Sequence, residues 1–404
     1  MPEIQAAKSA QDLPKIRIIS DGRFPSLDTN TQQIMKSASA LARTGLDIEL
    51  CIPSRNRFSF FSSEHFRACL FDYYNIHGPL KIRRERALPL GSIRPERLTH
   101  GILTPIYALF RGIKIFYSRD IIPTLFALLL RRYVLFETYR CLGDDSPRIM
   151  RLLVRRSSSP RFLGIITHSQ FSADSIIKAG FPKDKVIALH NGFDPEEMLP
   201  VLGKDEARRQ TNLPMSAFLL VYTGNLHSQK GIESILELAA LKPAYTFALV
   251  GGGSDDDVAG LRKIIQEKDI KNIIFTGRVA VSDVPKYLYA ADVLLIPPTA
   301  APLKKFGRTV LPFKTFLYMA AGRPILAPST PDLTEVLDAS SAMLVPPDDY
   351  AASIAAIDRL AESNELRETL SEGAKRAAAH LTWDARGEKI ARWISLRYKQ
   401  ATER

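Results

Sequence analysis

The sequence contains few of the features that mark disulfide-bonded, zinc-binding or membrane-spanning proteins. Three cysteines occur in 404 residues without a C-x-x-C pair, which argues against a disulfide framework and a zinc site. The most apolar stretch, Ile121 to Leu130, contains Pro123 and is far shorter than the ~20 residues that cross a bilayer, so we expect a buried helix. Met1 to Lys15 lacks the apolar segment of a secretory signal or anchor, and a cytoplasmic protein is expected.

Acidic residues are scarce in the first half of the chain. Residues 1–200 carry +10 of the total net charge of +12. This charge is concentrated in two clusters of basic residues. Basic clusters attract phosphates of nucleic acid, of anionic lipid headgroups or of a pyrophosphate-bearing acceptor, although a solvated basic surface without a partner is an equal alternative. With two tryptophans and no basic residues interleaved with aromatics, nucleic acid is not an expected partner. The basic clusters comprise Lys81, Arg83, Arg84, Arg86, Arg94 and Arg97, and then Arg148, Arg151, Arg155, Arg156 and Arg161.

Strand and helix patterns alternate along the chain, which is typical of parallel sheets covered by helices. The length and two successive series of strands predict two Rossmann-like α/β domains at residues 1–200 and 201–382, joined by the polar segment Asp194 to Pro214. The expected strands are Lys15–Ser20, Asp47–Ile52, Ile113–Tyr117, Tyr133–Glu137, Gly164–His168 and Lys185–Leu189, and then Phe218–Thr223, Tyr245–Val250, Ile273–Phe275, Val293–Ile296 and Pro324–Ala327.

The end of the chain and one apolar stretch of the first domain are expected to have structural roles. Long amphipathic helices are expected over Tyr350 to Arg376 and over residues 383–404, where the last helix packs back on the first domain. The apolar stretch Ile102 to Phe116 is interpreted as core in preference to membrane contact.

Glycines follow several strands of the second series. The segment G-N-L-H-S-Q-K-G from Gly224 to Gly231 joins a strand to a helix, and there backbone amides, a helix start and Lys230 suit a diphosphate. Alone, such a loop is a weak signal, but Gly251–Gly253 and Gly277 end the next two strands, and nucleotides bind at the carboxyl edge of such sheets. The G-x-G-x-x-G fingerprint is absent, which disfavours a nicotinamide or flavin enzyme.

A helix is predicted from Pro312 to Gly322, after the expected strand Val293–Ile296. Pro312 suits its first position, so the amides of Thr309, Val310 and Leu311 would face an anion, and Gly322 ends it.

Together these motifs resemble the C-terminal domain of family 4 retaining glycosyltransferases. The resemblance covers Phe218 to Pro347 through G-N-L-x-x-x-K-G, V-G-G-G, F-x-G-R-V and P-F-K-T-F-L-Y-M-A-A-G-R-P-I-L-A. Phe24–Pro25 and His190–Asp194 look like landmarks of the same family in the first half. The resemblance implies a GT-B fold, two domains facing across a cleft, and metal-independent transfer from a nucleotide diphosphate sugar.

The resemblance also implies roles for individual residues. Lys230 would bind the donor diphosphate, and Asn225 stands where many members place an arginine for the same purpose. The remaining expected donor contacts are Gly22, Gly224, Gly252, Arg278, Val279, Thr309, Val310, Leu311 and Leu317, and the expected acceptor side comprises Arg119, Glu137 and Tyr139. No metal and no cofactor are expected, and a uridine diphosphate sugar is favoured over a guanosine one.

The sequence departs from the family pattern at three positions. The family's E-x7-E pair falls on Thr309 and Leu317, so the usual carboxylate contacts to the donor sugar and ribose are missing. The E-x-H motif reads Glu137-Thr138-Tyr139, which replaces a histidine near the reacting sugar. His168 and His190 are interpreted as structural.

Two functions remain open on these residues. The first is transfer of a hexose-type sugar to a surface polysaccharide or lipid-linked glycan, with peripheral contact of the basic first domain to the inner membrane face. The second is a catalytically degenerate GT-B protein that binds a partner in glycan assembly.

Overall fold

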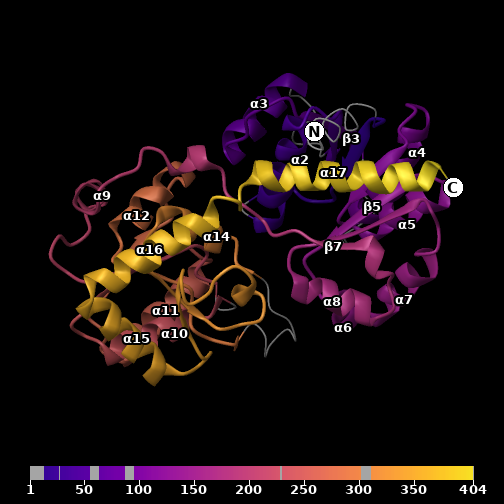
Figure 1. The fold of residues 1–404 in the computed structure, drawn as a ribbon. Helices are drawn as coiled ribbons and strands as arrows, with labels where there is room; N and C mark the ends of the chain where they lie inside the picture. The colour runs from indigo at the N-terminus through magenta and orange to yellow at the C-terminus, as the bar shows by residue number, and fades with distance from the viewer. Residues whose placement is uncertain are drawn as a thin grey trace, which may run out of the picture. The chain divides into compact units, whose positions relative to one another are not determined.

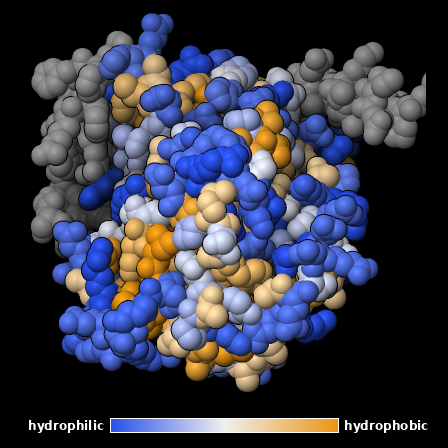
Figure 2. Space-filling view, turned by 90° about the vertical axis from the view of Figure 1, so that its left-hand side faces the viewer, coloured by the Kyte–Doolittle hydropathy of each residue, from blue (hydrophilic) through white to orange (hydrophobic). Residues whose placement is uncertain are grey.

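The computed structural model describes residues 13–26, 28–54, 63–86, 95–227, 230–301 and 311–403. These form two compact units, unit 1 (residues 1–191 and 383–404) and unit 2 (residues 192–382). The boundary lies at Asn191, whereas the sequence placed it at residue 200. Each unit holds one parallel sheet covered by helices, which confirms the predicted pair of α/β domains (Figure 1). The face drawn in Figure 2 is mainly hydrophilic, and its apolar residues gather in small groups.

Unit 1 contains a seven-stranded parallel sheet with the order β3-β2-β1-β4-β5-β6-β7. Apolar residues from alternate faces of its strands form a core on each side of the sheet. Its strands are β1 (Ile16–Ile19), β2 (Ile48–Ser54), β3 (Lys81–Arg86), β4 (Ile115–Ser118), β5 (Tyr133–Thr138), β6 (Phe162–Thr167) and β7 (Val186–Ala188). Its helices are α2 (Thr29–Arg43), α3 (Ser63–Tyr74), α4 (Pro95–Leu109), α5 (Ile121–Leu129), α6 (Leu142–Asp145), α7 (Pro147–Arg156), α8 (Gln170–Lys178) and α17 (Trp383–Thr402).

The last helix, α17, belongs to unit 1 although the chain reaches it from unit 2. It lies along unit 1 in yellow in Figure 1 and packs on α2. Gly387 permits the close approach, because a Cβ there would lie 2.8 Å from the carbonyl carbon of Ala40.

Unit 2 contains a six-stranded parallel sheet with the order β10-β9-β8-β11-β12-β13. It too has an apolar core on each face. Its strands are β8 (Leu219–Thr223), β9 (Thr246–Val250), β10 (Ile273–Gly277), β11 (Val293–Leu295), β12 (Ile325–Pro328) and β13 (Met343–Val345). Its helices are α9 (Lys204–Thr211), α10 (Ile232–Leu241), α11 (Asp255–Glu267), α12 (Val284–Ala290), α14 (Lys314–Ala321), α15 (Tyr350–Glu362) and α16 (Asn364–Ala378).

The structure differs from the sequence predictions in several details, and strand β13 was not predicted. The first basic cluster begins with an unpredicted strand, β3, whose charged residues suit a sheet edge. The predicted helix from Tyr350 to Arg376 is two helices, because the Ser363 hydroxyl accepts a hydrogen bond from the amide of Leu366 and starts α16. Pro312 is not the first helical residue, since α14 begins at Lys314.

Candidate functional site

The carboxyl edge of the unit 2 sheet is built from glycines that let neighbouring backbones approach closely. The amide of Gly224 donates to the carbonyl of Val250 (2.8 Å), and that of Gly251 donates to Gly277 (3.0 Å). A Cβ on Gly251 would lie 1.9 Å from the Gly224 carbonyl oxygen, and its φ of +145° also favours glycine. Strand β8 adjoins the point where strand order reverses, which is where open α/β sheets bind ligands.

Lys314, the first residue of α14, reaches this edge beside β8. Its Nζ lies 3.3 Å from the centre of the Tyr222 ring, a cation–π contact, and 2.9 Å from where a Cβ of Gly224 would be. Burial lowers the pKa of the Lys314 ammonium well below its usual range, and the neighbouring charge of Lys230 lowers it further.

Lys230 approaches the same place from the loop before α10. Its amide donates to the carbonyl of His227 (2.8 Å), and surrounding protein lowers the pKa of its ammonium although the residue stays accessible to solvent. Across the part of unit 2 that the structure describes, neither Lys230 nor Lys314 pairs with a carboxylate. Two positive charges that no carboxylate of the described residues compensates therefore converge where a diphosphate was predicted. Sequence reasoning selected Lys230 but gave Lys314 no role, although it stands in the quoted P-F-K-T-F motif.

Asn225 uses its side chain within the loop itself. Its Oδ1 accepts a hydrogen bond from the amide of His227 (3.0 Å), and its carbonyl accepts one from the Tyr222 hydroxyl (2.8 Å). The side chain therefore shapes the turn that carries Lys230. Direct contact of Asn225 with a donor diphosphate stays a prediction.

The other predicted donor residues of unit 2 are divided between the sheet edge and the core. Arg278 is exposed and lies against Gly252, where a Cβ would come within 2.6 Å of its Cγ. Leu311 is buried in the unit 2 core, and Val279 and Leu317 pack against that core. Leu317 lies one turn after Lys314 on α14. Thr309 and Val310 lie outside the described residues.

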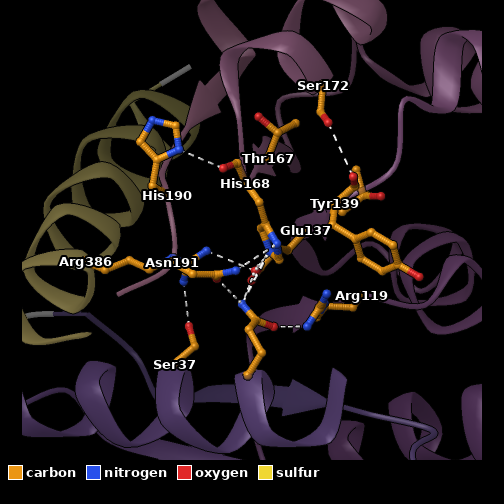
Figure 3. Close-up of polar contacts among 12 residues, drawn as sticks. Ser37, Arg119, Glu137, Tyr139, Thr167, His168, Ser172, His190, Asn191 and Arg386 are labelled. Carbon is orange, nitrogen blue, oxygen red and sulfur yellow. Dashed lines mark hydrogen bonds and ion pairs between the residues drawn. The ribbon is translucent and has the colours of Figure 1, made fainter. Parts of the chain in front are cut away.

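Unit 1 holds a second polar cluster, centred on Glu137 near the end of β5 (Figure 3). Its carboxylate accepts hydrogen bonds from the Gln33 amide (2.9 Å), from Arg386 of α17 (3.0 Å) and from the Tyr117 hydroxyl. The cationic Arg386 and the His168 hydrogen bond hold the pKa of Glu137 well below its usual range against the effect of burial. Glu137 is thus an ionised, fully engaged acceptor that fastens α17 to the sheet.

His168 is the remaining partner of Glu137, with Nε2 2.5 Å from the carboxylate. Burial lowers the pKa of His168 to about 4, so the ring is neutral at pH 7. A proton on Nε2 satisfies Glu137 and leaves Nδ1 to accept from the Asn191 amide (3.5 Å). The nearby His190 donates from Nδ1 to the carbonyl of His168 (2.9 Å).

Arg119 and Tyr139 form the accessible side of this cluster. Arg119 follows β4, donates to the side-chain oxygen of Gln33 and lies over the Tyr139 ring, with its guanidinium carbon 5.6 Å from the ring centre. Both residues are partly exposed, whereas Glu137 is buried. The structure thus brings the three predicted acceptor-side residues together, with His168 near the Tyr139 ring that replaces the family histidine. Gly22 is elsewhere in unit 1, in the loop after β1, and its amide donates to the Ser20 hydroxyl (3.2 Å).

Neither a metal-ligand cluster nor a membrane-spanning helix occurs in the described ranges. No three His, Cys, Asp or Glu side chains there are grouped so that they could hold a metal ion. Asp255–Asp257 form the first turn of α11, which Ser254 caps. Within the same ranges, no helix has the length and apolarity needed to cross a membrane.

Comparison with solved structures identifies the fold. Sucrose-phosphate synthase from Thermosynechococcus elongatus superposes with a TM-score of 0.74 at 19% identity, covering 97% of this chain and 100% of that one. Anabaena HepE in complex with UDP gives a TM-score of 0.72 at 17% identity, covering 94% and 98%. The chain therefore has the GT-B fold.

Sequence comparison places a domain within this fold. Residues 203–377, all in unit 2, match the family model described as "Glycosyl transferases group 1". The D-inositol 3-phosphate glycosyltransferase of Thermomonospora curvata is 31% identical over 267 residues, which cover 61% of this chain and 60% of that protein. An alpha-galactosylglucosyldiacylglycerol synthase of Streptococcus pneumoniae is 30% identical over 138 residues, covering 33% and 37%. The chain thus spans less than two thirds of these relatives.

Proposed function

We propose that the protein is a retaining glycosyltransferase that transfers a sugar from a nucleotide diphosphate sugar to a polysaccharide or lipid-linked glycan. The observation that carries the proposal is the convergence of Lys230 and Lys314 at the glycine-ended edge of the unit 2 sheet. The glycosyl transferases group 1 match of this unit supports it, as does the UDP-glucose complex of the similarly folded Anabaena HepE. A uridine diphosphate sugar is the favoured donor.

In the proposed reaction the acceptor hydroxyl oxygen forms a bond to the anomeric carbon of the sugar. The bond from that carbon to the distal phosphate oxygen breaks, and the nucleoside diphosphate leaves with the electron pair. The acceptor proton passes to the departing phosphate or to solvent. Negative charge therefore grows on the diphosphate, and two lysine ammonium groups in a partly desolvated site stabilise it more strongly than water would. The two lysines make a resident metal or cofactor unnecessary in this proposal.

On the acceptor side, Arg119 and Tyr139 are the groups that a glycan or its phosphate would meet. The guanidinium of Arg119 has donors beyond the one given to Gln33, and a planar donor array suits a phosphate or a pair of sugar hydroxyls. Tyr139 offers an aromatic face and a hydroxyl. The buried Glu137 positions this pair through Gln33 and does not reach the acceptor itself.

The test combines donor turnover with nucleotide binding. Incubation with a panel of nucleotide sugars, with and without membrane extract, should show transfer or hydrolysis of one donor. Lys314→Met and Lys230→Ala should each weaken UDP binding by about tenfold, since a hydrogen bond to a charged group contributes ~1.5–3 kcal/mol. Lys263→Ala, an exposed lysine on α11, is the matched control and should bind UDP normally. Absence of turnover with every donor would overturn the proposal.

The alternative of a catalytically degenerate GT-B protein is favoured by two observations. Leu317 packs against the core where the family places a ribose-binding glutamate, and the Asn225 side chain is engaged in its own loop. Calorimetry with UDP and GDP separates the alternatives, because a protein without donor recognition would bind neither and would be insensitive to Lys314→Met.

A further inference from the structure

A basic hollow of about 310 Å³ lies in unit 1 at the amino-terminal edge of the sheet. This edge is opposite to the one that carries Arg119 and the end of β5. The hollow combines the turns that precede β4, β5 and β6 with the last turn of α17. It is lined by Lys114, Arg131, Arg132, Tyr133, Arg161, Tyr398 and Thr402.

In the part of the chain that the structure describes, no carboxylate neutralises the four cationic side chains of the hollow. The lining contains no acidic residue, and across the described ranges none of Lys114, Arg131, Arg132 and Arg161 forms an ion pair. Arg132 Nε is buried and has no hydrogen-bond partner among the described residues, which is costly for a donor on a charged group. Four like charges held together raise the energy of the protein unless an anion binds among them.

The backbone at Arg131 adds an independent observation. Arg131 follows the last turn of α5 with φ +57°, a left-handed conformation that glycine adopts most readily. Its amide donates to Leu128, and that of Arg132 donates to Ala127, as in a helix end that glycine would normally terminate. The chain therefore keeps an arginine at a position where backbone energetics favour glycine.

Aromatic residues shape the hollow around these charges. Arg161 lies over the Tyr133 ring, 5.2 Å from its centre, and the Tyr133 and Tyr398 rings pack edge to face at 4.8 Å. Burial raises the pKa of the Tyr398 hydroxyl, so it remains a protonated donor at neutral pH. The hollow thus offers guanidinium, ammonium and hydroxyl donors, which is the chemistry that binds phosphate.

Large apolar side chains lie exposed at the same edge. Phe110 follows α4 and is 86% exposed, and Leu129 ends α5 and is 62% exposed. The buried neighbours Ala108, Ile113 and Leu128 pack in one core cluster, which holds the ends of the two helices together. The sequence interpretation of Ile102–Phe116 as core was therefore wrong for Phe110. An exposed phenylalanine and leucine beside a basic hollow match the chemistry of an anionic membrane surface.

We propose that this hollow binds the phosphate headgroup of an anionic phospholipid while Phe110 and Leu129 enter the apolar layer. This gives the peripheral membrane contact expected from the sequence a defined place, remote in the unit 1 sheet from the residues assigned to the acceptor. It does not depend on sugar transfer. An enzyme that acts on a membrane-borne acceptor would be held at the surface through this edge.

The experiment measures cosedimentation of the full chain with phosphatidylcholine vesicles, with and without phosphatidylglycerol. We expect binding that requires the anionic lipid and weakens with salt. Arg131→Gly removes one charge while relieving the backbone, so it should fold at least as stably and bind the anionic vesicles about fivefold more weakly. Arg155→Gln, an exposed arginine of α7 outside the hollow, is the charge-matched control and should bind like the unaltered protein.

Two further measurements distinguish a lipid headgroup from a free phosphate as the ligand of the hollow. Phe110→Ser should weaken vesicle binding but leave the affinity for soluble pyrophosphate unchanged. If the protein binds pyrophosphate but shows no preference for anionic vesicles, the ligand is not a lipid. If Arg131→Gly and Arg155→Gln lose the same affinity for anionic vesicles, the hollow is not the binding site. UDP binding should be the same in all of these variants, so a failure here is distinct from a failure of donor recognition.

Discussion

Lys314 Nζ lies 3.3 Å from the centre of the ring of Tyr222. Tyr222 is near the end of β8, the strand that precedes the glycine-rich loop. The ring face stabilises the ammonium while burial and the charge of Lys230 oppose it. The site is therefore short of negative charge before a ligand arrives. The negative charge of a bound diphosphate would offset the repulsion between the two lysines. The pKa of Lys314 should therefore change when a diphosphate binds.

The stability of the protein should rise with pH because of Lys314. Its folded-state pKa is lowered, so the unfolded chain binds more protons between that pKa and the usual lysine value of about 10.4. The free energy of unfolding then increases as pH rises through this window. Denaturant titrations at pH 7 and pH 9 should show the increase in the unaltered protein and a smaller one in Lys314→Met.

Proton uptake on UDP binding is a second measure of the protonation of Lys314. A diphosphate favours the protonated ammonium and raises the pKa of Lys314, so calorimetry in buffers of different ionisation enthalpy should reveal proton uptake at pH values between the lowered pKa and the usual lysine value of about 10.4. Lys263→Ala should leave the uptake intact, whereas its persistence in Lys314→Met would assign the proton to another group.

Two glycine substitutions in unit 2 should have opposite effects. Gly251→Ala places a Cβ 1.9 Å from the Gly224 carbonyl oxygen, so we expect a loss of about 2 kcal/mol or more in unfolding free energy and weaker UDP binding. Gly260→Ala lies within helix α11 with nothing within 4 Å of the new Cβ. It should stabilise the protein by up to about 1 kcal/mol. Thermal unfolding and calorimetry measure both, and a stable, UDP-binding Gly251→Ala would contradict the assigned glycine contact.

Arg386 should be essential for holding α17 on unit 1. It donates to Glu137 at 3.0 Å and to the Ser37 hydroxyl at 2.7 Å, and both charged groups are buried. Arg386→Met leaves the Glu137 carboxylate without its closest cation, so we expect a loss of about 3–5 kcal/mol in unfolding free energy.

The matched control for this loss is on the same helix. Arg392→Met removes an exposed arginine 3.9 Å from Glu388 and should change the free energy of unfolding by at most about 0.5 kcal/mol. Similar losses for the two variants would show that α17 is held by its apolar face and not by Arg386.

Acid should destabilise unit 1 through His168. Its folded-state pKa of about 4 is below the usual value of about 6.5, so the unfolded chain binds the extra proton as pH falls through this window. We expect a loss on the order of 2 kcal/mol between pH 7 and pH 5. His168→Gln should lose less over that range, whereas His77→Gln, an exposed histidine, should behave like the unaltered protein.

The local pattern of the sequence was sufficient for the architecture and for the glycine-ended edge. Alternating β-branched runs and helical spacing are determined by near neighbours, so the two parallel sheets followed from them. Gly224 and Gly251 could be recognised because a strand that ends in glycine is a local signal. Local spacing was less reliable at element ends, since Ser363 divides one predicted helix and α14 begins after Pro312.

Contacts between distant residues were decided by the tertiary structure alone. The sequence identified Lys230 by its loop, but only folding brings Lys314 beside it, because the helix that carries Lys314 packs next to β8. Arg386 and Glu137 are 249 positions apart, and no local pattern pairs a residue of the last helix with the end of β5. The same holds for the basic hollow, whose charges come from separate turns. Chain-local propensity selects each element, whereas the burial of apolar faces determines which charged side chains meet.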